Sequence, residues 1–367
     1  MKVKIGDLTK IKTGKLDANA SSEDGQYPFF TCSKEPLKIS TYSYDCECVL
    51  VAGNGDLNVK YYNGKFDAYQ RTYIIENNSD GKLYMPYLYL FMEEYVEELR
   101  RQAIGGVIKY IKLGNLTDAM IELPSVEEQR NIVKILFKAK QILEQREIEL
   151  EKLDELIKAR FVEMFGNPDV NEKNWNVYKM EQLCEVGSSK RIYQNDQSLT
   201  GIPFLRISDL VNRMDTGSKD CDLFIPEELF EKFKKQGLVP ARGDILLTAR
   251  GTLGRCYIIQ DDDEFYFQDG MITWLSKFDE KITPLYISYL FEMPGFRKQI
   301  DALQAGSTVA YMSISMTKKL NIMVPPLELQ NQFAAFVAQT DKSKFEIQKS
   351  LEKTQLLFDS LMQEYFG

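Results

Sequence analysis

Apolar residues recur at helical spacing in two long stretches of the chain, residues 123–168 and 323–367. In the first stretch Leu136, Leu143, Leu150, Ile157 and Met164 follow one another every seven residues. A seven-residue apolar repeat without an internal proline or glycine is typical of a coiled-coil seam. At about 1.5 Å per residue, about 40 residues form a helix roughly 60 Å long. The pattern therefore predicts two long helices.

The second stretch is a copy of the first, because the motifs at both of its ends recur at a constant offset of 201 residues. Residues 123–129 and 324–330 each begin with an apolar residue and a proline, and a glutamine follows five residues after that proline. Each helical pattern then ends at a Phe-Gly pair, residues 165–166 and 366–367. Ser125 and Glu128 form a capping-box signature in the first copy. Pro326, which replaces Ser125, suits the first turn of the second helix.

Charged residues interrupt the seam differently in the two copies. Arg146 and Arg160 lie on seam positions of the first stretch, where the second stretch has Ile347 and Leu361. A seam that is charged in one copy and apolar in the other favours pairing between the two helices over pairing of each helix with itself. We therefore expect the two helices to pack on each other.

The regions that precede the two helices also repeat. Tyr27–Phe30 matches Ile202–Leu205 at an offset of 175, and residues 50–57 match residues 246–253 at an offset of 196. The offset only grows along the chain, as expected for an old duplication with insertions in its second copy. The largest insertion is predicted between residues 206 and 245.

Each repeated region has the pattern of a compact module. Short apolar runs bounded by turn residues predict strands at 48–52, 72–75, 244–248 and 271–275. Helical patterns are present at 86–102 and 284–303, and residues 166–175 form a linker. Mixed strands and helices predict a compact α/β or α+β module with a small, curved sheet.

Composition removes several classes of chemistry. Histidine is absent from the 367 residues, which excludes histidine nucleophile partners, general bases and metal ligands. Cys46 and Cys48 form one C-x-C without a second pair nearby, and the other cysteines are unevenly spaced. We therefore expect no disulfide framework and no bound metal.

The net charge and its distribution along the chain indicate little about function. The net charge is −8, and each of the segments 1–122, 123–170, 171–322 and 323–367 carries two more acidic than basic residues. A surface for nucleic acid must therefore arise from local clustering within a module. No run is apolar enough for a membrane span and the N-terminus lacks a signal-peptide core, so we expect a cytoplasmic protein without membrane contacts.

The order of module, long helix, module and long helix, with a proline before a glutamine-containing helix start, resembles the specificity subunit of Type I restriction–modification systems. The resemblance covers essentially the whole chain and implies an α+β fold with an internal pseudo-twofold repeat. It implies target recognition domains at 1–122 and 169–322, each reading one half of a split site in double-stranded DNA. It also implies antiparallel spacer helices at 123–168 and 323–367.

The resemblance further implies partners that carry the chemistry. Two methyltransferase subunits would dock on the helices, and two restriction subunits would join through them. S-adenosylmethionine, ATP and Mg²⁺ would then be bound by those partners and not by this chain. The residues assigned here to the partner and helix interface are Pro124, Gln129, Leu136, Leu143, Leu150, Ile157, Met164, Pro325, Gln330, Val337, Leu351, Phe358 and Leu361.

Two matching turns are the leading candidates for reading DNA. Residues 250–255, Arg-Gly-Thr-Leu-Gly-Arg, follow a predicted strand, and their glycines allow the backbone to come close to a ligand. The matching turn in the first module is Asn-Gly-Asp at 54–56. Two turns with the same backbone but different side chains at their tips would suit two modules that recognise different DNA sequences. A hairpin turn with solvated arginines is an equal alternative.

Base reading requires Arg, Asn or Gln, and phosphate contacts require Lys, Arg or small hydroxyls. The glycine loops near 105 and 306 are the next candidates, with a helix C-cap as the alternative, and isolated basic residues are weaker ones. The acidic run 261–264 is expected to be a solvated loop and not a cation site. The complete set of DNA-binding candidates is Lys12, Lys15, Asn54, Asp56, Gln70, Arg71, Gly106, Lys109, Lys190, Arg191, Arg206, Arg250, Thr252, Arg255, Ser307, Thr308 and Lys318.

No catalytic motif accompanies these candidates. The chain lacks a GxxxxGK[ST] phosphate loop, and Asn167-Pro168-Asp169 lacks the second proline and the aromatic residue of an adenine methyltransferase motif. We therefore expect a non-enzymatic adaptor. The alternatives are a detached targeting portion of a single-chain restriction–modification enzyme and a coiled-coil scaffold that binds only proteins.

Overall fold

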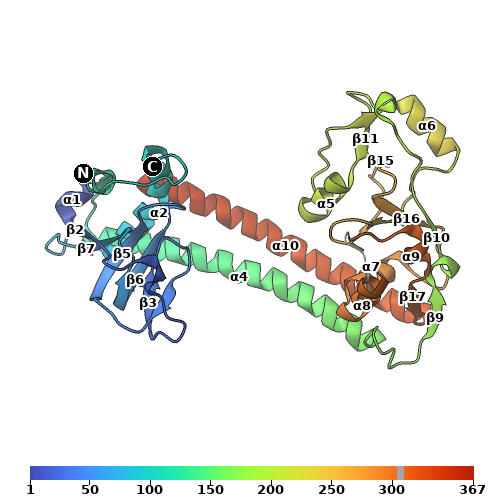
Figure 1. Ribbon diagram of the computed structural model, residues 1–367, viewed down its shortest axis with the longest axis horizontal. Helices are drawn as coiled ribbons and strands as arrows, with labels where there is room; N and C mark the ends of the chain where they lie inside the picture. Colours follow the sequence, from blue (N-terminus) through green and yellow to red (C-terminus); the bar gives the residue numbers. More distant parts are fainter. Residues whose placement is uncertain (304–309) are drawn as a thin grey trace. The chain divides into compact units, whose positions relative to one another are not determined.

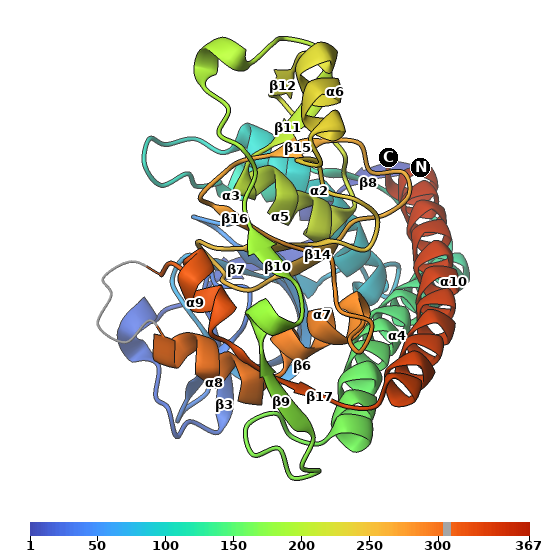
Figure 2. The same cartoon turned by 90° about the vertical axis from the view of Figure 1, so that its right-hand side faces the viewer.

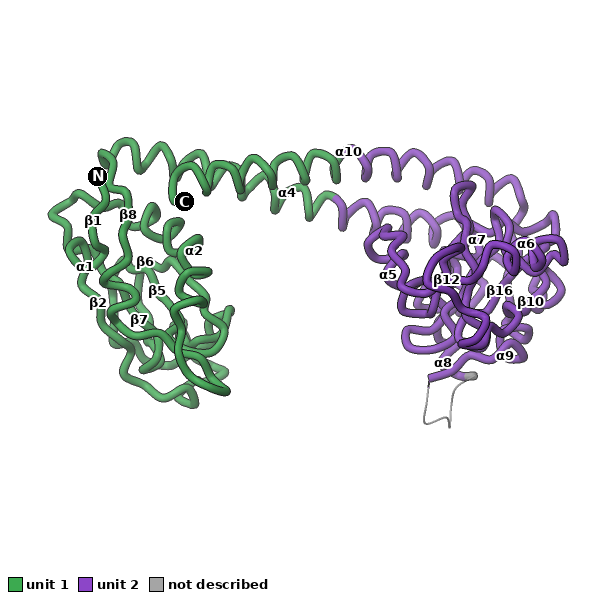
Figure 3. Tube along the Cα trace, turned by 90° about the horizontal axis from the view of Figure 1, so that it is seen from above, with its two compact units in different colours: residues 1–149, 347–367 green, residues 150–346 purple. Residues whose placement is uncertain are grey.

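The computed structural model describes residues 1–303 and 310–367, and its chain divides into two compact units (Figure 3). Unit 1 consists of residues 1–149 and 347–367, and unit 2 of residues 150–346. Helices α4 (Val126–Phe165) and α10 (Leu327–Phe366), labelled in Figure 1, each contribute residues to both units, as the two colours of Figure 3 show. Each is 40 residues long, which confirms the two long helices expected from the heptad pattern.

Unit 1 is built on a mixed six-stranded sheet with the strand order β2-β7-β5-β6-β3-β4. All neighbours pair antiparallel except β3 and β6, which are parallel. The strands are β2 (Thr9–Thr13), β3 (Tyr27–Phe30), β4 (Leu37–Ile39), β5 (Tyr44–Ala52), β6 (Val59–Ala68) and β7 (Thr72–Asn77).

Unit 2 repeats this order in two shorter sheets, β10-β16-β13-β14 and β12-β11-β15. The parallel pair recurs as β11 and β15. The strands are β10 (Glu185–Gly187), β11 (Ile202–Leu205), β12 (Phe224–Ile225), β13 (Ile245–Thr248), β14 (Cys256–Ile258), β15 (Tyr266–Phe267) and β16 (Ile272–Ser276).

One long strand of unit 1 corresponds to two short strands of unit 2. Strand β6 pairs with β5 along its first part and with β3 at its end. In unit 2 these pairings belong to β14 and β15, which are separated by residues 259–265. The segment therefore divides a sheet that is continuous in unit 1. The shared strand order supports the duplication inferred from the sequence offsets.

Helices cover the sheets and join them to the long helices. Unit 1 contains α1 (Ile5–Leu8), α2 (Met85–Gln102) and α3 (Leu113–Thr117), and strands β1 (Lys2–Lys4) and β8 (Met120–Glu122) pair antiparallel just before α4. In unit 2, α9 (Ile314–Lys318) and the pair of β9 (Asn176–Lys179) with β17 (Asn321–Val324) have the corresponding places before α10.

The single helix predicted over 284–303 is wrong. The structure has two helices there, α7 (Pro284–Glu292) and α8 (Pro294–Leu303). Pro294 has no backbone N–H and restricts the residue before it to extended conformations, so Met293 ends α7 with φ −70° and ψ 130°.

The additional elements of unit 2 lie in the predicted insertion 206–245. They are the helices α5 (Ile207–Thr216) and α6 (Glu227–Lys235), which flank β12, the counterpart of β4. Figures 1 and 2 show α5 and α6 beside β11, β12 and β15, at the end of the module away from α8 and β9. Phe230 and Phe233 of α6 pack with Phe204, Ile225 and Tyr266 in a small core of their own.

The long helices join the main core of each unit by equivalent aromatic contacts. In unit 1 the ring of Phe366, at the end of α10, lies 5.1 Å from that of Tyr87 on α2. In unit 2 the ring of Phe165, at the end of α4, lies 4.9 Å from that of Tyr286 on α7. In each unit the end of one long helix shares a core with the start of the other, as in an antiparallel pair. This confirms that the two helices pack on each other.

The predicted seam is buried at both ends of α4. Leu136, Leu143, Ile157 and Met164 are buried and Leu150 is half-buried. On α10, Val337 is buried, whereas Leu351, Phe358 and Leu361 are half-buried. In the described part of the chain, residues 1–303 and 310–367, no helix combines the length and apolar character needed to cross a bilayer.

Candidate nucleic-acid interface

The turn predicted to read DNA in unit 1 follows directly after β5. Gly55 has φ +70°, a conformation that side chains with a Cβ rarely adopt. Its N–H donates to the carbonyl of Lys109 at 3.0 Å, and the N–H of Ile111 donates to the carbonyl of Gly53 at 2.9 Å. These bonds tie the turn to loop 103–112, in which Ile104 and Tyr110 exchange two backbone hydrogen bonds of 3.0 and 2.9 Å.

The turn of unit 2 has the same backbone frame. Gly251 also has φ +70°, and the N–H of Met312 donates to the carbonyl of Ala249 at 3.0 Å. Arg250 forms a β-bridge with Tyr311, as Asn54 does with Tyr110 in unit 1. The guanidinium carbon of Arg250 lies 5.2 Å from the centre of the Tyr311 ring. This contact holds an exposed arginine over an aromatic face.

The same carbonyl inside each turn is bound by different side chains. In unit 1 the amide of Asn58 donates to the carbonyl of Asp56 at 2.8 Å. In unit 2 the hydroxyl of Thr248 donates to the equivalent carbonyl of Thr252. The tips differ as well, because Asn54-Gly-Asp and Arg250-Gly-Thr offer different donors and acceptors. The structure thus contains one frame with two sets of tip side chains.

The tip of unit 1 is partly engaged by its neighbours. The carbonyl oxygen of the half-buried Asn54 side chain accepts from the thiol of Cys32 at 2.9 Å, so its amide group is the remaining donor. Asp56 is exposed and lies 3.3 Å from Arg100. Gly106 and Lys109 are exposed in loop 103–112, and Arg71 is exposed beside β7.

Three other candidates of unit 1 lie on or beside β2 and β7. Lys12 forms an ion pair with Glu76 across β2 and β7, and its ammonium group is 4.8 Å from the centre of the Tyr44 ring. Partial burial lowers the pKa of Lys12 and the bond to Glu76 raises it, with a net upward shift. Gln70 donates to Asp17 at 2.8 Å, and Lys15 is exposed. Lys12 is therefore engaged within the sheet.

The second arginine of the unit 2 turn points to the insertion. Arg255 forms an ion pair with Asp215 at the end of α5, with Nη2 and Oδ1 2.5 Å apart. The hydrogen bond from Arg255 lowers the pKa of Asp215 below its usual value. Thr252 is exposed, like Arg250. In this turn Arg250 is thus more available to a ligand than Arg255.

The remaining candidates of unit 2 are dispersed. Arg191 pairs with Asp269 at 2.8 Å, and Arg206 is held by two bonds to Asp209 at the start of α5. Lys190 is exposed above the Phe233 ring of α6, and Lys318 is the half-buried last residue of α9. Ser307 and Thr308 lie outside the described residues.

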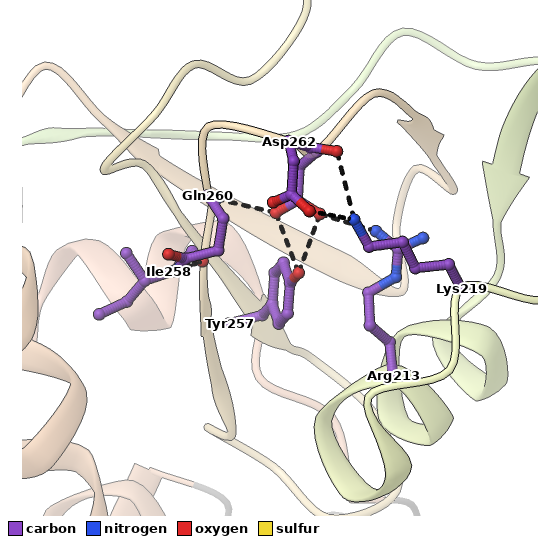
Figure 4. Close-up of polar contacts among 7 residues, drawn as sticks. Arg213, Lys219, Tyr257, Ile258, Gln260 and Asp262 are labelled. Carbon is purple, nitrogen blue, oxygen red and sulfur yellow. Dashed lines mark hydrogen bonds and ion pairs between the residues drawn. The ribbon is translucent and has the colours of Figure 1, made fainter. Parts of the chain in front are cut away.

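The acidic run 261–264 is exposed at Asp261, Asp262 and Glu264, as expected for a solvated loop, but the side chain of Asp263 is buried. Arg242 pairs with Asp261 at 3.0 Å and Lys219 with Asp262 at 2.5 Å, and Arg213 of α5 pairs with Asp263 at 2.9 Å. Figure 4 shows Arg213, Lys219 and Tyr257 directed toward this run. The side chains of Arg213 and Asp263 are only 6% and 1% exposed. These ion pairs connect the run to residues of the insertion. They join residues that are distant in the sequence, so the sequence alone did not predict them.

Tyr257 completes this cluster. Its hydroxyl donates to the Asp263 carboxylate, with distances of 3.0 and 2.9 Å to the two oxygens, and burial raises its pKa to about 12. The N–H of Gln260 adds a further bond of 2.8 Å to Asp263. A buried carboxylate with this many donors is a structural anchor. Among the described residues, no cluster of three or more His, Cys, Asp or Glu side chains is placed to bind a metal.

The motif glutamines at the helix starts join each module to its long helix. Gln129 is fully buried, and its amide donates to the carbonyls of Lys82 and Pro124, both at 2.9 Å, while its oxygen accepts from the N–H of Tyr84 at 2.8 Å. Gln330 makes the same three bonds, to the carbonyls of Lys281 and Pro325 and the N–H of Thr283, at 2.9, 2.9 and 2.8 Å.

These bonds explain the spacing of proline and glutamine in both copies, because one amide satisfies three backbone groups beside the first turn of the helix. Pro325 is buried and Pro124 half-buried. Most residues assigned to the interface are thus occupied inside the chain. The exposed apolar residues of the long helices are a different set: Ile135, Phe137, Ile148, Leu156 and Val162 on α4, and Leu327, Phe345, Leu356 and Leu357 on α10.

Comparison with known proteins agrees with the duplicated architecture. Residues 1–152 and 172–356 match the family model of the Type I restriction modification DNA specificity domain. The EcoDI specificity subunit of Escherichia coli is 40% identical over 156 residues, which are 42% of this chain and 34% of that protein. The MjaVIII specificity subunit of Methanocaldococcus jannaschii is 24% identical over 390 residues, covering 96% of this chain and 90% of the relative.

Solved structures share the fold. The Type I restriction–modification S subunit from M. genitalium superposes with a TM-score of 0.63 at 16% identity, covering 100% of this chain and 96% of that one. A chain from a structure on complex assembly and conformational transition of the Type I system gives a TM-score of 0.61 at 14% identity. With matches over both modules and both helices, the chain belongs to the family of Type I restriction–modification DNA specificity subunits and carries two of its specificity domains.

Proposed function

We propose that the module of unit 1 reads one half of a split site in double-stranded DNA through residues 54–56 and loop 103–112, and that the module of unit 2 reads the other half through residues 250–252. The observation that carries this proposal is the common turn frame with unlike tips. Two half-sites of different sequence require the same approach to DNA but different donors and acceptors.

The side chains at the tips have the chemistry for base reading. Arg250 is exposed and offers the bidentate donor set that recognises guanine, whereas the amide of Asn54 suits adenine. Arg71 and Lys109 are exposed near the first turn and suit phosphate contacts. The long helices would then fix the distance between the half-sites, as geometry does in other paired readers.

In this proposal the chain performs no catalysis, and two methyltransferase subunits dock on the long helices in the cytoplasm. Leu156 on α4 and Leu357 on α10 support two docking sites, because they are 201 residues apart and are 47% and 56% exposed. The partners would bind S-adenosylmethionine, and restriction subunits recruited by them would bind ATP and Mg²⁺.

The first test is co-expression with the neighbouring methyltransferase, followed by methylome sequencing. A split adenine-methylated motif with a fixed spacer is the expected result. A stable complex without any new methylated motif would favour a protein-binding scaffold. A methyltransferase gene that encodes a separate protein would count against the detached portion of a single-chain enzyme.

The second test assigns a half-site to a turn. Arg250→Ala should weaken binding through one half-site only, by about 1–3 kcal/mol if the arginine is a bidentate base contact. Arg242→Ala is the matched control, because that arginine is exposed in the same module but is paired with Asp261. Equal losses at both half-sites, or no loss with Arg250→Ala, would contradict the assignment.

Docking has its own test. Leu156→Asp and Leu357→Asp should each remove one of two methyltransferase subunits, and native mass spectrometry of the purified complex would count them. Retention of both subunits in each variant would show that these leucines are not part of the docking surface.

A further inference from the structure

An arginine contacts the same backbone carbonyl in both reading turns. In unit 1, Nη2 of Arg100 donates to the carbonyl of Leu57 at 2.9 Å. In unit 2, Nη2 of Arg297 donates to the carbonyl of Leu253 at 2.8 Å. The two leucines are equivalent residues, 196 positions apart, and the arginines are 197 apart. A contact preserved between two diverged copies indicates a common requirement of the turn.

Leu57 and Leu253 mark the point at which each turn returns to the module. Their side chains are only 2% and 6% exposed and belong to the main apolar core of their units. The opposite end of each turn is held by the backbone bond from Ile111 or Met312. Each tip is therefore fixed at both ends: by the backbone hydrogen bond on one side, and on the other by a buried leucine whose carbonyl binds an arginine.

The guanidinium groups also connect the turns to helices. Arg100 lies near the end of α2, where Nη1 contacts Glu97 and Nη2 also reaches Asp56 at 3.3 Å. Arg297 lies on α8, and its Nη1 contacts the carbonyl of Phe291 on α7 at 3.4 Å. A guanidinium carries several donors in a rigid plane, so it can hold two groups at once, whereas a lysine ammonium is a single point donor on a flexible stem.

We propose that Arg100 and Arg297 are positioning residues that set the tips of the two reading turns against DNA, an inference that rests on the proposed function of those turns. Hydrogen bonds to base edges depend on donor positions within a few tenths of an ångström. Loss of the arginine would free the carbonyl of the leucine and let the tip shift. Discrimination between bases should then fall at the half-site served by that turn.

The test uses the full chain in complex with its methyltransferase and four duplexes: the cognate site, each half-site changed alone, and both changed. Arg297→Met removes the donors but keeps an aliphatic stem. It should reduce discrimination at the half-site of unit 2 about tenfold, the range of one charged hydrogen bond. Discrimination at the other half-site and affinity for the doubly changed duplex should stay as in the wild type. Arg100→Met should give the mirror-image result.

Two comparisons separate positioning from other roles. Lys298→Met is the matched control, because Lys298 is the next residue on α8, is exposed, and pairs with Asp169 away from the turn. An arginine that acted only on phosphate would instead weaken all four duplexes alike and reduce the salt dependence of binding. An arginine needed only for folding would lower the melting temperature and the affinity for every duplex with an intact half-site. Either pattern would overturn the proposal.

Arg297→Lys keeps the experiment decisive if Arg297→Met does not fold. It should retain part of the discrimination, because one cation can still reach the carbonyl. Wild-type discrimination in Arg297→Met, or in Arg297→Lys where Arg297→Met does not fold, would refute positioning while leaving the reading turns intact. A wild-type complex that discriminates at neither half-site would refute the proposed function itself.

Discussion

Replacement of Gln330 by leucine tests how each module is fixed to its long helix. The side chain of Gln330 is 1% exposed and makes three hydrogen bonds, to one backbone N–H and two carbonyls. Leucine has a similar size, so the change removes the bonds without opening a large cavity. The N–H of Thr283 and the carbonyls of Lys281 and Pro325 would be left unpaired in a buried place.

The expected cost follows from these three bonds. At about 1 kcal/mol for each, Gln330→Leu should lower the free energy of unfolding of unit 2 by roughly 3 kcal/mol. For a domain of this size the melting temperature falls by about 2–4 °C per kcal/mol, so a decrease of roughly 6–12 °C is expected. Differential scanning calorimetry would measure it.

A local measurement makes this prediction specific. The amide of Thr283 is protected by the Gln330 side chain, so its hydrogen exchange should accelerate in Gln330→Leu. Gln332→Leu is the control, because Gln332 is exposed on the same helix and makes one bond of 3.2 Å to Glu328. If both variants melt at the same temperature and Thr283 stays protected, the glutamine does not join module and helix.

Three other changes test separate features. Arg213→Met should lower the free energy of unfolding in a urea titration by about 3–5 kcal/mol, because it leaves the buried Asp263 carboxylate without its cation. Lys219→Met removes an exposed pair and should lower it by less than about 1 kcal/mol. Equal losses would contradict the burial argument. Burial raises the pKa of Cys46 to about 11, so its alkylation by iodoacetamide should stay slow at pH 8 and accelerate only as the pH approaches that value. Rapid reaction of Cys46 itself at pH 8 would refute this, whereas reaction of the other partly exposed cysteines would not. Ser125→Ala removes an acceptor 3.3 Å from a first-turn N–H and should cost about 1 kcal/mol in thermal unfolding, whereas an unchanged melting temperature would show that the cap contributes nothing.

The sequence was most informative where spacing alone determines the structure. The heptad pattern predicted two continuous helices, and the constant offset of 201 residues identified equivalent positions in them. The offset of 196 identified the two turns that share a backbone frame. These signals are local or repeat within the chain, so one sequence is enough to find them.

Contacts between distant residues could not be predicted in the same way. Arg213 and Asp263 are 50 positions apart, and the residues around each of them do not indicate that the two form an ion pair. The burial of Asp263 within the otherwise exposed run 261–264 was therefore not expected. Arg100 and Arg297 were missed for the same reason, since an arginine near a helix end is usually an exposed charge. The break at Pro294 was readable, but the strong helical pattern on both sides concealed it.

The duplication separates contacts that maintain the frame from those that can differ between readers. The polar contacts that both units share end on backbone groups. The glutamine amides and the arginines bind carbonyls, and the Tyr87 and Tyr286 hydroxyls bind the carbonyls of Glu122 and Met323. A carbonyl remains whatever side chain the residue carries, so these contacts survive sequence divergence. The side chains that support the tips instead differ between the units: Cys32 and Asn58 in one, and Thr248 in the other. A new specificity can therefore arise by changing a tip together with its immediate supports, while the frame that presents the tip stays the same.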